Sequence, residues 1–179
     1  MKTKKLLIVC GVVGVFTCIM KLLIFKRDVF ETLYWLIALV SIVPIAWKDY
    51  KEHIIPNQYL LWVLRFGIPL FFVNLVVYNE YFISISVNKV LGLLVGGGIF
   101  LLAMLISPKG VGAGDVKLYA VIGFLLGSRA IFNVLLYALV LGAVCSIVLL
   151  ISKKKTRKDE LPLAPYTFIG LLLALCLGV

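Results

Sequence analysis

Long apolar runs separated by short polar segments dominate this chain of 179 residues. Several of the runs approach the roughly 20 residues that a helix needs to cross a bilayer. They predict seven spans, at approximately residues 6–25, 30–47, 59–78, 90–106, 116–127, 131–151 and 161–179. The expected fold is therefore an all-α membrane protein, a polytopic bundle of about seven transmembrane helices.

The first span forms an N-terminal membrane anchor over residues 1–28, and the transmembrane domain that follows covers residues 29–179. A basic start followed by an apolar run also fits a cleaved signal peptide. We favour an uncleaved span, because the apolar run is long for a signal peptide. In addition, residues 15–18 make a poor lipoprotein-type cleavage site.

The fifth run is short: residues 116–127 would make a helix of only about 18 Å, against a hydrocarbon core of about 30 Å. Either the helix continues through Ser128 and Arg129, or it begins below the membrane surface. The glycines that precede Asp115 permit such a sunken turn. Small-residue spacings at Gly92–Gly96 and Gly123–Gly127 allow neighbouring helices to approach closely.

Composition supports the membrane assignment, with 63% hydrophobic and 15% charged residues and a mean hydropathy of +1.14. The net charge of +10 comes from basic residues in short loops, so we predict a lipid partner and no nucleic acid. The 4 cysteines show no zinc spacing and no disulfide framework. The sequence implies no cofactor and no metal, and it does not indicate an oligomeric state.

The loop charges predict the orientation. If the N-terminus is cytoplasmic, 12 basic residues lie on the cytoplasmic side of the membrane and 4 on the other. The four are Lys26, Arg27, Lys89 and Arg129. This asymmetry places both Asp49 and Asp115 at the cytoplasmic face.

Among the 8 acids, Asp49 and Asp115 stand out because each lies where an apolar helix meets a loop on the same face. Acids in such positions are candidates for function. Two neighbouring carboxylates resist joint ionisation, which leaves one base to activate water and one acid to donate a proton. The structural alternative is that Asp49 ends its loop and Asp115 caps the fifth helix. The only histidine, His53, lies in a charged loop and suggests no nucleophilic triad.

Two short sequence motifs resemble those of a known family. Asp49 is followed by Ile55-Pro56-Asn57, and Gly112-Ala113-Gly114-Asp115 is followed by Lys117. Together with a proline-bearing start of the last helix at 161–165, they resemble the type IV prepilin peptidase family, over residues 47–170. That family has a membrane Gly-x-Gly-Asp motif and a six-helix catalytic core, to which this chain adds its N-terminal span.

The resemblance implies an aspartic endopeptidase that cuts the basic leader of a type IV prepilin or pseudopilin. The reaction would take place at the cytoplasmic face of a bacterial plasma membrane, with Asp49 and Asp115 as the catalytic dyad. The residues that shape the site would be Gly112, Gly114, Lys117, Pro56 and Asn57. Larger family members carry an insertion with paired cysteines and also N-methylate the product. This chain resembles the short form without that insertion, so the resemblance is not extended to methyltransferase activity.

Two other functions fit parts of the pattern. A small transporter or pilus-assembly subunit would use Asp49 and Asp115 as a proton or ion relay. Such a relay favours acids near the bilayer midplane and an internal repeat, and this sequence shows neither feature. An intramembrane protease of the presenilin type shares the Gly-x-Gly-Asp motif but lacks the Pro56-Asn57 motif that follows Asp49 in this sequence.

Overall fold

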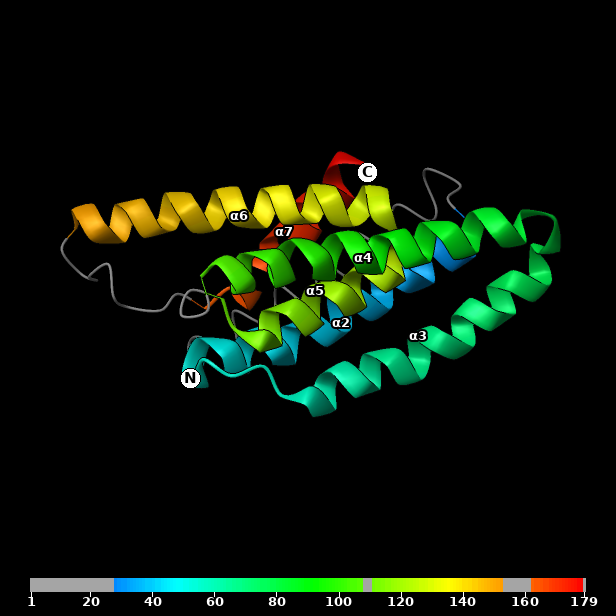
Figure 1. Ribbon diagram of the computed structural model, residues 1–179, viewed down its shortest axis with the longest axis horizontal. Helices are drawn as coiled ribbons and strands as arrows, with labels where there is room; N and C mark the ends of the chain where they lie inside the picture. The colour runs from blue at the N-terminus through cyan, green and yellow to red at the C-terminus, as the bar shows by residue number, and fades with distance from the viewer. Residues whose placement is uncertain (1–27, 108–110, 153–161, 179) are drawn as a thin grey trace.

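The computed structural model describes residues 28–107, 111–152 and 162–178, and its regular elements are all helices. They form an elongated bundle whose long helices run along one direction (Figure 1). In chain order they are α2 (Val29–Glu52), α3 (Asn57–Val77), the 3-10 helix η1 (Asn79–Tyr81), α4 (Phe82–Ile106), α5 (Ala113–Leu126), α6 (Ser128–Ile151) and α7 (Ala164–Leu177). The predicted first span lies outside the described residues, so the division at residue 28 stays a prediction.

Four of the described helical segments are long and apolar enough to cross a membrane: α2, α3, η1 with α4, and α6. Their outward faces carry large apolar side chains, such as Trp62 and Phe66 on α3, which are more than half exposed in the isolated chain. Apolar surface of this extent is stable where lipid covers it. The prediction of an all-α, multi-pass membrane bundle is confirmed, while the number of seven spans stays a prediction.

Two predicted loops are helical instead. α2 continues past Trp47 to Glu52, because its last turn closes on His53, whose N–H donates to the Asp49 carbonyl at 2.9 Å. Residues 79–89 were expected to be a polar connector, but α4 already begins at Phe82. The helix tolerates the polar Lys89 because this side chain finds a hydrogen-bond partner inside the bundle.

The short helix α5 lies at the centre, packed against α2, α3, α4 and α6. Its residues Leu118, Tyr119 and Leu125 are almost completely buried. It ends at Leu126, since Gly127 adopts a φ of 86° and a new helix starts at Ser128. Of the two alternatives for this short run, the one in which the helix continues through Ser128 and Arg129 is therefore wrong.

The glycine spacings on α4 and α5 were expected to allow a close helix approach, and in the structure these two helices approach each other there. A Cβ atom added to Gly92 would lie 2.2 Å from the Gly123 carbonyl oxygen. A Cβ atom added to Gly96 would lie 2.2 Å from the Tyr119 carbonyl oxygen. The two backbones touch directly, which only glycine allows at this distance.

We predict that Gly96→Ala separates α4 from α5 and destabilises the protein by about 1–3 kcal/mol, the usual cost of overpacking. Gly98→Ala is the matched control on the same helix, because an added Cβ atom there meets nothing within 4 Å. Thermal unfolding of the purified proteins in detergent measures both. An equal Tm for the two variants would contradict the close contact.

Candidate active site

Asp49 lies in the last turn of α2, only 6% exposed. Its Oδ2 accepts a hydrogen bond from the Ala164 N–H at 2.9 Å, and the Leu163 N–H lies near the same carboxylate. These amides stand at the N-terminus of α7, where free N–H groups and the helix dipole favour a negative charge. The carboxylate of α2 therefore joins the start of α7, 115 residues later in the chain.

Asp115 is the third residue of α5, and Gly112 is the cap of that helix. Asp115 thus holds the N3 position of the helix, and the Gly112 N–H lies near enough to its carboxylate to favour the charged form. The alternative in which Asp115 is the N-cap of the helix is therefore wrong, because Gly112 holds that position. A Cβ atom added to Gly112 would lie 3.3 Å from Oδ2 of Asp115, so a larger side chain at position 112 would crowd the carboxylate.

The fold brings the two aspartates together. α2 packs against α5, and the C-terminal end of α2 meets the N-terminal end of α5 (Figure 1, left). Asp115 lies outside the four helical segments that are long enough to span a membrane. Burial raises the pKa of Asp115 to about 6, and the nearby Asp49 carboxylate adds to the increase.

The loop between α2 and α3 contacts the glycine turn before Asp115. Lys117 Nζ donates to Oδ1 of Asn57, the first residue of α3, at 3.2 Å. Pro56 is the N-cap of that helix. A Cβ atom added to Gly114 would lie 3.0 Å from the Ile55 Cβ. The predicted site-shaping residues thus gather beside the two aspartates, while their role in catalysis stays a prediction.

The contacts that hold α5 against α7 and α4 near Asp115 were not identified from the sequence. The Tyr119 hydroxyl, one helical turn after Asp115, forms a hydrogen bond of 2.6 Å with Thr167 Oγ1 on α7. The Tyr119 ring stacks on Phe100 of α4, with centroids 4.2 Å apart. The donors of Ala164 and Leu163 were also missed, although the proline that follows them signals the start of a helix. These contacts join α4, α5 and α7 beneath the carboxylates.

The remaining charged residues at this end lie outside the pair. His53 is exposed and ends α2 with a φ of 52°, and Glu52 forms an ion pair of 3.8 Å with Lys48. Among the residues that the structure describes, no three His, Cys, Asp or Glu side chains cluster as metal ligands. What the described side chains offer for chemistry is two carboxyl groups at one end of the bundle, which interact electrostatically and have different partners.

We predict that Asp115→Asn stabilises the protein in a pH-dependent way. The folded-state pKa of Asp115 is raised from the ordinary 3.8 to about 6. The folded chain therefore binds more protons than the unfolded chain between these values, and wild-type stability falls as pH rises through them. The neutral variant should nearly match wild type at pH 4 and exceed it above pH 6, by about 3 kcal/mol.

The measurement is Tm in detergent between pH 4 and pH 8. Glu80→Gln, which removes an exposed carboxylate from the opposite end of the bundle, controls for the loss of one negative charge. A Tm difference between Asp115→Asn and wild type that is constant across this range would contradict the raised pKa.

Comparison of the sequence with known proteins identifies the family of this chain. A family model described as the Type IV leader peptidase family matches residues 34–147. The prepilin leader peptidase/N-methyltransferase of Bacillus subtilis (strain 168) is 29% identical over 140 residues. The match covers 76% of this chain and 52% of that protein, so the chain spans about half the length of this relative. No solved structure matches. Because the family model matches more than half of the 179 residues, with Asp49 and Asp115 inside the match, this chain belongs to the Type IV leader peptidase family.

Proposed function

We propose that this protein is an aspartic endopeptidase that removes the basic leader from a type IV prepilin or pseudopilin. The observation that carries the proposal is the packing of α2 against α5, which brings Asp49 and Asp115 to one end of the bundle, where the charge of Asp49 acts on Asp115. The match to the Type IV leader peptidase family and to a prepilin leader peptidase supports the substrate class. The N-methyltransferase part of that relative's name is not carried over to this chain.

The contacts of the two aspartates suggest how they divide the chemistry. Asp49 accepts from the Ala164 N–H at the start of α7, and charge-assisted bonds of this kind favour the ionised carboxylate. Asp115, with its raised pKa, is the member of the pair that more readily holds a proton. Asp49 is therefore the proposed base and Asp115 the proposed acid.

In the proposed reaction, Asp49 takes a proton from a water molecule whose oxygen attacks the scissile carbonyl carbon. Asp115 gives its proton to the carbonyl oxygen, which produces a neutral tetrahedral intermediate. When this intermediate collapses, the C–N bond breaks and the leaving nitrogen takes the proton held by Asp49, while a hydroxyl proton returns to Asp115. The reaction forms no covalent link to the enzyme.

The reaction is proposed to occur at the cytoplasmic face of a bacterial plasma membrane. Lys48, Lys51 and Lys117 lie at the same end of the bundle as the aspartates, in agreement with the positive-inside rule. The alternative of a transmembrane proton or ion relay is less well supported. The described acids lie at the two ends of the bundle, with Asp49, Glu52 and Asp115 at one end and Asp28, Glu31 and Glu80 at the other.

We predict that the purified protein in liposomes cleaves a prepilin with a basic leader, and that Asp49→Asn and Asp115→Asn each lower kcat at least about 100-fold. Such a loss is typical when a positioned acid or base is removed. Mass spectrometry identifies the new amino terminus and shows whether a methyl group is added. Glu80→Gln is the matched control and should cleave at the wild-type rate. An inactive wild-type protein, or an active variant of either aspartate, would overturn the proposal.

A further inference from the structure

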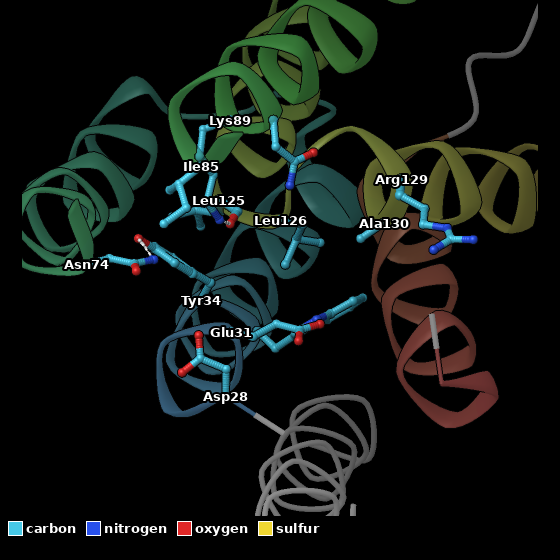
Figure 2. Close-up of a pocket in the computed structure, with 12 residues that line it drawn as sticks. Asp28, Glu31, Tyr34, Asn74, Ile85, Lys89, Leu125, Leu126, Arg129 and Ala130 are labelled. Atoms are coloured by element: carbon cyan, nitrogen blue, oxygen red, sulfur yellow. Dashed lines mark hydrogen bonds between the residues drawn. The ribbon is translucent and has the colours of Figure 1, made fainter. Parts of the chain in front are cut away.

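The opposite end of the bundle holds a buried lysine. Lys89 of α4 is 6% exposed, and its Nζ donates to the carbonyl oxygen of Leu125 (Figure 2). The same Nζ lies 3.5 Å from the centroid of the Tyr34 ring. An ammonium group inside a membrane bundle is costly unless such partners compensate it. Leu125 is the second-last residue of α5, so Lys89 satisfies a carbonyl that the end of the helix leaves free.

The residue before it holds the next part of the same turn. Asn88 Oδ1 accepts from the Ser128 N–H at 3.0 Å and from Ser128 Oγ at 2.9 Å, where α6 begins. Between these anchors Gly127 has a φ of 86°, and an added Cβ atom would lie 2.5 Å from Asn88 Nδ2. Two consecutive residues of α4, Asn88 and Lys89, thus form hydrogen bonds to both sides of the α5–α6 turn.

Lys89 lines a cavity of about 320 Å³, and several of the other polar residues that line it have partners within the protein, as the following contacts show. Asp28 accepts from the Tyr78 hydroxyl at 2.9 Å. Glu31 lies close enough to Lys89 to interact with its charge. Figure 2 shows Asn74 directed toward Tyr34, and the Asn74 amide donates to the Tyr34 hydroxyl at 3.4 Å. Most of the polar groups next to Lys89 thus have partners within the protein, and among the described residues Oδ1 of Asn74 is buried without a hydrogen bond.

These hydrogen bonds are important because α5 carries Asp115 at its other end. Asp115 precedes Leu125 by ten residues, or about 15 Å along the helix. The contact of α5 with α4 is made largely through glycines, which offer few interlocking side chains to oppose sliding, while the stack of Tyr119 on Phe100 holds the middle of the helix. Polar anchors at the C-terminal end of α5 add to this contact in fixing the position of the helix along its own axis.

We propose that Lys89 and Asn88 are positioning residues that fix α5 along its axis and thereby set where Asp115 meets Asp49. They touch neither aspartate and act only through the helix. The consequence for cleavage rests on the proposed peptidase function, whereas the mechanical part does not.

The first test reads the position of α5 without using activity. Ile55→Cys and Gly114→Cys are introduced into a chain whose four native cysteines are replaced by serine. Ideal Cβ positions at these two sites lie 3.0 Å apart, and a disulfide joins Cβ atoms at about 3.8 Å. The measured quantity is the rate of disulfide formation with copper phenanthroline. Lys89→Met should slow it at least about fivefold, and Asn88→Ala should slow it about twofold or more.

Three control variants separate positioning from general loss of stability. Arg129→Met removes a cation that lines the same cavity, and Asn133→Ala removes an amide that, among the described residues, donates within α6 to the Arg129 carbonyl. Gly170→Ala destabilises a different contact, since an added Cβ atom lies 2.9 Å from the Val134 carbonyl oxygen. All three should form the disulfide at the rate of the parent pair.

The second test uses the chain with native cysteines and a prepilin substrate. Lys89→Met should lower kcat about tenfold or more with KM within twofold of wild type, because α5 displacement alters the dyad rather than substrate binding. Parent-rate disulfide formation in both Lys89→Met and Asn88→Ala would overturn the proposal. If Lys89→Met does not fold, Asn88→Ala alone decides. Slowed disulfide formation in a protein that never cleaves prepilin would uphold the positioning role and overturn the peptidase function.

Discussion

The central constraint on this structure is that α5 is both enclosed and short. Its 14 residues give a helix of about 21 Å, surrounded by α2, α3, α4 and α6. The carbonyl groups at its buried C-terminal end cannot rely on water within a membrane bundle, so the protein has to supply partners. Lys89 reaches the Leu125 carbonyl there, while at the other end the Asp115 carboxylate lies near the Gly112 N–H.

The candidate active site follows from the same requirement. The N-terminus of α7 also needs acceptors for its first amides, and Asp49 provides one. A single carboxylate thus satisfies the start of α7 while it stands next to Asp115. The hydrogen bond between Tyr119 and Thr167 ties α5 to α7 beneath the pair, and stacking on Phe100 ties α5 to α4. The geometry of the two acids therefore depends on three helices that are remote from each other in sequence.

Hydropathy located most of the helices because the period and length of an apolar run report directly on its surroundings. It was less successful where polar residues are helical. Lys89 and Asn88 look like part of a loop, but they are helical because the α5–α6 turn provides their partners. Asp49 looks like a loop residue after Trp47, yet α2 extends to Glu52. Such partners lie 36 to 115 residues away, beyond the reach of any local pattern.

The sequence by itself determined the all-α membrane class, the two acidic motifs and the glycines of the α4–α5 contact, because these depend on composition and short spacings. Only the tertiary structure decided that Asp49 faces the start of α7 and acts electrostatically on Asp115. It also decided that Lys117 bonds Asn57 and that Lys89 is buried. The physical reason is that helix packing, rather than local preference, chooses which distant backbone ends and charged groups must satisfy each other.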